Sequence, residues 1–274
     1  MNITFSPTFT LLQHEADLME GCLSIGLTAF RNATVSDKRK FYSGFFNTSI
    51  AFERLMKLIV VVDYMLNNNF NPPTKNQLKA YGHDLVSLYQ SSVNAANRAG
   101  ITNVAMPLEN SIEEKILNLL SEFAKFSRYY NLDSLNSKSA KDVDPLAEWE
   151  GIINRVIEED VPEKKLKKIT ESAENIHNDI KDITFTIQQG MSGESLTLLQ
   201  ALGLPEKQLL AAPYIMVRLF NILSPLIRIA SELGHKGFYT RAPDGTGPHI
   251  PSFNETLVYF IADNTQIKKK KQWP

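Results

Sequence analysis

Two residues that could carry acid–base chemistry stand side by side in YGHDLVSLYQ, residues 81–90, where His83 precedes Asp84. A histidine titrates near neutral pH and can move protons, and a carboxylate beside it could orient the ring. The same stretch also reads as a helix start, because Gly82 permits a tight turn and Asp84 can accept hydrogen bonds from first-turn backbone amides. This structural interpretation explains each residue without a substrate. It predicts that Asp84 caps a helix and that His83 is largely buried at the helix entry.

A second candidate site is the glycine- and proline-rich stretch FYTRAPDGTGPHIP, residues 238–251. It contains Arg241 and His249, and functional side chains concentrate on loops that a rigid scaffold supports. Turns fixed by proline also explain this composition, and we favour that interpretation over a binding site.

The most concentrated positive charge is the lysine run in IKKKKQWP, residues 267–274. Such a run can bind the phosphate backbone of a nucleic acid in a salt-dependent way. For a run near a chain end, a frayed and solvated tail is the more ordinary outcome, and we expect it here. The formal net charge of the whole chain is −1. Any nucleic-acid binding must therefore depend on a local patch.

Several site classes are excluded because their motifs are missing. The chain has no glycine-rich phosphate loop that opens a helix, no GxSxG elbow, and no HExxH or zinc-finger spacing among its five histidines and one cysteine. The sequence therefore predicts no metal site and no cofactor. The single cysteine excludes a disulfide within the chain and fits a reducing compartment.

The location of the protein is inferred from its apolar runs. The first residues show no secretory pattern, and the longest strongly apolar run, residues 58–62, is far shorter than the ~20 residues that a membrane span requires. We expect a soluble, cytoplasmic protein with no membrane partner.

The elements that must position these side chains are predicted from the apolar residues, which recur at helical spacing along most of the chain. This spacing predicts an all-α fold of seven or eight helices. Start signals include Ser6-Pro7, the capping-box spacings Thr74–Gln77 and Ser111–Glu114, and Asp144-Pro145. The predicted long helices cover about 7–32, 41–66, 84–97, 111–130, 144–157, 163–189 and 206–233. In the last of them we expect prolines 213 and 225 to cause kinks or interruptions. Residues 258–261 could form a lone strand or the end of a helix.

The polar stretch DSLNSKSAKDV, residues 133–143, has no apolar periodicity and reads as a linker. It predicts two parts: residues 1–132, and a second helical region, residues 144–274, with the glycine- and proline-rich loop and the basic tail.

The first part resembles the HEPN superfamily over roughly residues 8–132. The resemblance is carried by HDLVSL at 83–88, by the preceding apolar helix with Glu53 and Lys57, and by FAKFSRYYNL at 123–132. In that family a similar HDL..L opens the third helix of a four-helix bundle, and an RY segment ends or follows the fourth. The resemblance therefore implies a helical bundle that forms a homodimer, with Arg128 and Tyr129 as candidate binding residues. It also implies an RNA-related role in toxin–antitoxin, phage-defence or RNA-processing systems, with an antitoxin or defence protein as a further partner.

Catalytic members of the superfamily are metal-independent ribonucleases with an R-x4-6-H motif. The arginine would stabilise phosphate charge and the histidine would act as acid or base. The one pair with this spacing here is Arg228 and His235, in RIASELGH. It lies outside the matched region, and an isoleucine follows the arginine where the family usually has a polar residue. An arginine on a helix surface and a histidine near a helix end explain the pair without catalysis.

These observations favour an HEPN-like cytoplasmic protein with an RNA-related stress or phage-defence role, in which binding predominates over catalysis. Two alternatives stay open. One is a ribonuclease toxin that uses Arg228 and His235, or a composite of Arg128 and His83. The other is a helical protein-interaction scaffold, which the near-neutral charge would suit.

Overall fold

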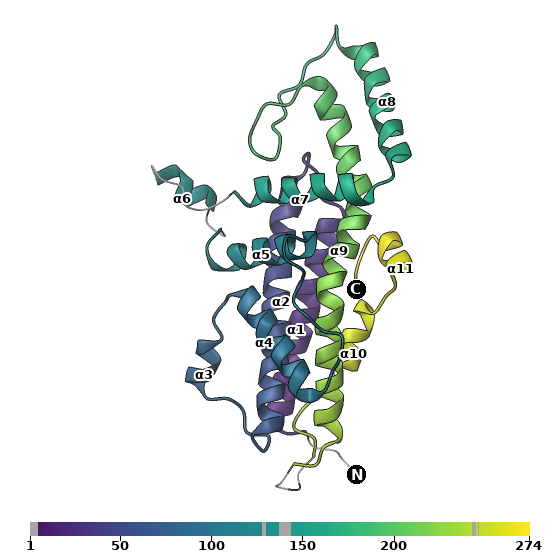
Figure 1. Ribbon diagram of the computed structural model, residues 1–274. Coiled ribbons are helices and arrows are strands. Elements are labelled where there is room, and N and C mark those ends of the chain that lie inside the picture. The colour runs from purple at the N-terminus through teal and green to yellow at the C-terminus, as the bar shows by residue number, and fades with distance from the viewer. Residues whose placement is uncertain (1–4, 128–129, 137–143, 243–244, 246) are drawn as a thin grey trace.

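The computed structural model (Figure 1) describes residues 5–127, 130–136, 144–242, 245 and 247–274. Across these residues the protein is all-α, 72% helical and without strands, so the predicted fold class is confirmed. The long helices are α1 (Pro7–Arg31), α2 (Lys38–Asn67), α4 (Leu85–Ala99), α5 (Ile112–Lys125), α7 (Pro145–Asp160), α8 (Glu163–Ile180) and α9 (Leu198–Tyr239). The short ones are α3 (Lys75–Ala80), α6 (Tyr130–Asn136), α10 (Asn254–Leu257), the 3-10 helix η2 (Val258–Phe260) and α11 (Asn264–Lys269).

α1 and α2 form a long antiparallel hairpin, seen in purple in Figure 1. Ser6 caps α1 as predicted, because its hydroxyl accepts a hydrogen bond from the Phe9 amide at 3.1 Å. The two helices approach closely at Gly26, where a Cβ atom would lie 2.8 Å from the Thr48 backbone nitrogen. A larger side chain at Gly26 would therefore force the two helices apart.

Helix starts in the next segment follow the predicted caps. Thr74 and Gln77 form a complete capping box at α3, and the Ser111 hydroxyl accepts the Glu114 amide at the start of α5. α5 ends at Lys125 instead of reaching residue 130, because Phe126 leaves the helical conformation (φ −133°, ψ −51°).

α9 differs most from its prediction. It begins at Leu198, where Thr197 and Gln200 form a capping box, and continues to Tyr239 through three internal prolines. An internal proline removes a hydrogen bond and costs about 3 kcal/mol or more. The packing of α9 offsets this cost, since its buried face contacts α1, α2, α4, α5 and α7.

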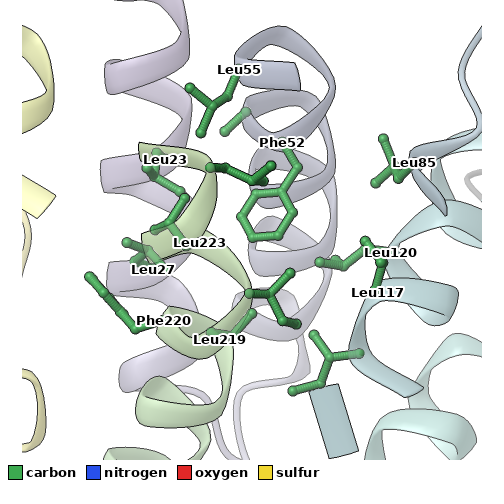
Figure 2. Close-up of a cluster of buried hydrophobic side chains, with 14 of the residues drawn as sticks. Leu23, Leu27, Phe52, Leu55, Leu85, Leu117, Leu120, Leu219, Phe220 and Leu223 are labelled. Atoms are coloured by element: carbon green, nitrogen blue, oxygen red, sulfur yellow. The ribbon is translucent and has the colours of Figure 1, made fainter. Parts of the chain in front are cut away.

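One hydrophobic core contains residues from both predicted parts of the chain. Figure 2 shows side chains of α1, α2, α4 and α5 together with Leu219, Phe220 and Leu223 of α9. Trp149 of α7 is 1% exposed, stacks on Phe30 with ring centroids 4.5 Å apart, and meets Phe45 edge-on at 5.5 Å. The boundary predicted at 133–143 stays a prediction, and residues 137–143 lie outside the described part of the chain.

α8 and the first turns of α9 form an arm that extends beyond α7 at the top of Figure 1. α8 ends at Ile180, nine residues before the predicted end at 189, and Ala173 is the residue of this helix that is buried. A turn at residues 181–183 follows α8, and residues 184–188 are neither helical nor part of a turn.

The C-terminal segment is ordered, which corrects the expectation of a frayed tail. Ile267 of α11 and Trp273 are 2% and 3% exposed. The Trp273 backbone amide donates to the Thr28 hydroxyl at 3.0 Å, and Asn32 donates to the Lys271 carbonyl at 2.9 Å. Residues 258–261 form η2 and its end instead of a strand.

Within the described residues, α9 is the one helix long and apolar enough to cross a membrane by length and composition. Its most apolar 18-residue window has a mean hydropathy of 1.5, and 56% of that window is buried inside the protein. Core helices with a buried face pass the same test.

Candidate functional site

A shallow pocket of about 290 Å³ lies where α1, α2 and the turn before α4 meet. Its lining is mostly charged: Glu15, Ile50, Glu53, Arg54, Lys57 and His83. Arg54 forms an ion pair with Glu15 across α1 and α2. The pocket thus contains the histidine of the HDLVSL motif and the two α2 residues that carried the sequence resemblance.

The Glu53 carboxylate organises this pocket. One oxygen, Oε1, accepts hydrogen bonds from Lys57 Nζ at 2.8 Å and from His83 Nδ1 at 2.9 Å. Burial by itself would raise the pKa of Glu53, but the hydrogen bonds and charges of Lys57 and His83 outweigh it and hold the pKa below its usual value. Because an ionised carboxylate only accepts hydrogen bonds, Nδ1 carries the ring proton of a neutral His83. Nε2 is then the ring atom available to a ligand.

Asp84 caps α4, as the sequence predicted. Its carboxylate accepts the Ser87 amide at 3.0 Å and forms an ion pair with Lys125 of α5 at 2.9 Å. The Ser87 amide and Lys125 together lower the pKa of Asp84. Gly82 takes φ +61°, the left-handed conformation that the turn requires.

The predicted burial of His83 is wrong. Its side chain is 65% exposed, because the imidazole reaches across the surface to Glu53 instead of packing beneath the helix entry. The partner in α2 lies 30 residues earlier in the chain, beyond the reach of any local pattern. His83 is therefore a solvent-accessible, carboxylate-oriented imidazole.

Arg228 and His235 lie seven residues apart on α9, on one helix face but about 10 Å apart along its axis. The Arg228 guanidinium is engaged by Glu232 at 2.9 Å and by the Thr102 carbonyl. His235 packs on Tyr239, with ring centroids 4.7 Å apart. Within one chain these two side chains do not converge on a common point.

The remaining predicted residues do not join the pocket. Arg128 and Tyr129 lie outside the described residues. Arg241 is exposed just after α9, and the His249 ring lies 5.9 Å from Phe70, which follows the end of α2. The structure therefore brings His83 to Glu53 and Lys57, and places Arg241 and His249 in a separate region beyond the ends of α2 and α9.

A charge cluster that the sequence analysis missed joins α5, α7 and α9. Arg218 binds Asp160 at 2.8 Å and Glu113 at 3.2 Å, with Glu159 at 3.4 Å. The hydrogen bonds that Arg218 donates to Asp160 and Glu113 raise its pKa despite partial burial. With its donors already occupied, Arg218 ties three helices together. Its partners lie 58 to 105 residues away in sequence, so no spacing rule could have found them.

Among the described residues, no three His, Cys, Asp or Glu side chains are placed to hold a metal ion. Comparison with known proteins finds no matching family model, no matching curated protein and no matching solved structure.

Proposed function

We propose that this chain is an HEPN-like cytoplasmic RNA-binding protein with a stress or phage-defence role, in which binding is the function. The proposal includes a homodimer and an antitoxin or defence protein as partner, as the sequence resemblance implies. It is supported by the all-helical fold and by the His83-Asp84 motif, which opens the third long helix beside Glu53 and Lys57.

The observation that carries RNA binding is the ordered lysine run. Lys268 and Lys270 help to fix the segment, because Lys268 lies 4.4 Å from the Tyr214 ring centroid and Lys270 donates to the Tyr259 carbonyl. Lys269 and Lys271 are exposed on this fixed backbone. Ammonium groups held in place lose less entropy on binding phosphates than those of a frayed tail.

Replacing Lys269 and Lys271 with glutamine is expected to weaken binding of single-stranded RNA about tenfold at low salt. Each lost phosphate contact also reduces the slope of log K against log salt by about 0.7, so the double variant should lose about 1.4. Fluorescence anisotropy over a salt series measures both quantities. The matched control is Lys164→Gln/Lys168→Gln on exposed positions of α8, with the same change of charge. Equal effects of the two variants would show that binding is general electrostatics, and no binding by the native chain would favour the scaffold alternative.

A second candidate function, metal-independent RNA cleavage, is favoured by the geometry of His83 with Glu53. A histidine oriented by a carboxylate, with its other nitrogen accessible, can act as a general base, and such a group contributes about 10²–10⁴-fold to a rate. In this alternative a neighbouring cation such as Arg54 would stabilise phosphate charge.

Incubation with total RNA in EDTA separates binding from cleavage. From the binding proposal we expect no cleavage by the native chain. If the native chain does cleave RNA, loss of activity in His83→Ala but not in Arg228→Ala or His235→Ala would assign the reaction to the pocket. The opposite pattern would assign it to the α9 pair. His83→Ala is a safe replacement because its side chain is 65% exposed.

A further inference from the structure

The tip of the α8–α9 arm carries the most exposed apolar segment of the described chain. After α8 ends, residues 183–187 read Ile-Thr-Phe-Thr-Ile. The side chains of Ile183, Phe185 and Ile187 are 83%, 83% and 90% exposed. Residues 181–183 form a turn, and residues 184–188 are neither helical nor part of a turn. The three apolar side chains stand at alternate positions, as side chains on one face of a strand do, and all three are directed into solvent.

The backbone of this segment also has a free edge. Gln188 and Gly190 pair with Leu196 and Glu194, since the Leu196 amide donates to the Gln188 carbonyl at 3.0 Å and the Gly190 amide to the Glu194 carbonyl at 2.8 Å. The amides and carbonyls of alternate residues point to opposite edges of a strand. Those of Phe185 and Ile187 therefore point away from this pairing, and they form no hydrogen bond within the described structure, whereas the Ile183 amide already donates to the Ile180 carbonyl at 3.0 Å. The free edge therefore consists of the backbone groups of Phe185 and Ile187.

Contacts with the bundle hold the segment in place. Gln188 donates to the Ser36 hydroxyl at 3.0 Å, Lys38 donates to the Gly190 carbonyl, and Ser192 donates to Glu150 at 3.2 Å. These contacts fix the paired edge next to the loop before α2. A fixed strand loses less entropy when it adds a partner than a free loop would.

The sequence of the segment identifies the partner. Ile-Thr-Phe-Thr-Ile reads the same in both directions. An antiparallel pair of two copies, centred on Phe185, therefore places each residue opposite a residue of the same type. Ile183 then faces the partner copy's Ile187, Thr184 faces its Thr186, and the two Phe185 rings meet on the two-fold axis. Aromatic, β-branched and Thr–Thr cross-strand pairs are all favourable. Next to these five paired residues, Asp182 of one copy faces Gln188 of the other, so no like charges oppose each other.

We propose that two copies of this chain associate through residues 183–187, by antiparallel pairing of the free edge about Phe185. The pairing is isologous, as two-fold symmetry requires. It specifies an interface outside the region of HEPN resemblance and does not depend on RNA binding. Three side chains and a short strand bury roughly half of the ~800 Å² per partner of a stable interface, so the dimer is weak, with a dissociation constant on the order of 10–100 μM.

The test uses the full chain of 30.9 kDa in sedimentation experiments between about 5 and 200 μM. The native protein is expected to shift from monomer to dimer over this range. Phe185→Lys places two ammonium groups on the axis and is expected to weaken the dimer at least about tenfold. The matched control, Leu108→Lys, changes a side chain that is 80% exposed elsewhere and should leave the association unchanged. A native chain that stays monomeric, or a dimer that Phe185→Lys leaves intact, would overturn the proposal.

Disulfide trapping tests the register. In a Cys22→Ser background, Thr184→Cys and Thr186→Cys are made as separate proteins. Paired positions 184 and 186 have Cα atoms about 4.5 Å apart, which a disulfide can bridge. Two copies of position 184 lie about 8 Å apart, beyond its reach. Oxidation should therefore link the mixture and neither protein alone. Equal linking by one variant alone would contradict this register, and capture of an unrelated protein without self-association would assign the strand to another partner.

Discussion

A fragment of residues 1–132, expressed alone, is expected not to fold cooperatively, although it contains the whole region of HEPN resemblance. Between residues 219 and 229 alone, α9 supplies six large side chains that are at most 2% exposed, and all of them pack into the shared core: Leu219, Phe220, Ile222, Leu223, Leu226 and Ile229. Burying one such side chain contributes about 1.5–3 kcal/mol, so the six together contribute about 9–18 kcal/mol. The total stability of a domain is only about 5–15 kcal/mol. The faces of α1 and α2 that α9 covers would also become exposed in the fragment.

Far-UV circular dichroism with a urea titration measures this result. The fragment should show reduced helicity and no cooperative transition, while the full chain unfolds in one step. A control truncated after residue 262 removes α11 and the tail but keeps α9, and it should still unfold cooperatively. A cooperative transition in the 1–132 fragment would instead establish the first part as an independent domain.

Trp149→Ala is expected to destabilise the full chain by about 3–5 kcal/mol, the usual cost of removing a large aromatic side chain from a core. Trp149 is 1% exposed and fills the space between Phe30 of α1 and Phe45 of α2. α7 is amphipathic, and this ring contacts both helices of the α1–α2 hairpin. A cavity of this size between three helices cannot close without moving their backbones.

The change in unfolding free energy can be measured by urea titration with detection at 222 nm, which does not depend on the tryptophan itself. Trp273→Ala is the comparison, because Trp273 is 3% exposed but lies on a terminal segment that can detach without opening the core. It should cost clearly less than Trp149→Ala. A loss below about 1 kcal/mol for Trp149→Ala would mean that α7 is not an integral part of the core.

Much of the local structure was predictable, because its causes are local. Ser6, Thr74, Asp84 and Ser111 cap helices at the positions that the sequence indicates, since a cap depends on a side chain and amides two or three residues away. The apolar spacing likewise gave the all-α class. The start of α9 could also have been predicted from the sequence, because TLLQ at 197–200 is a capping box. Pro205 instead indicated a helix start near residue 206, because proline is common at the first position of a helix.

The sequence alone determined the helices and the positions at which most of them begin, because those signals act over one turn. Only the tertiary structure decided that α9 continues through its prolines, that the lysine run is held in place, and that the side chain of His83 lies exposed against Glu53. Each of these outcomes depends on contacts between residues about 30 to 250 positions apart, such as Trp273 with Thr28, which no periodicity contains. The motif HDLVSL therefore identified a helix start correctly, while the carboxylate that makes its histidine a candidate site residue came from the packing of another helix.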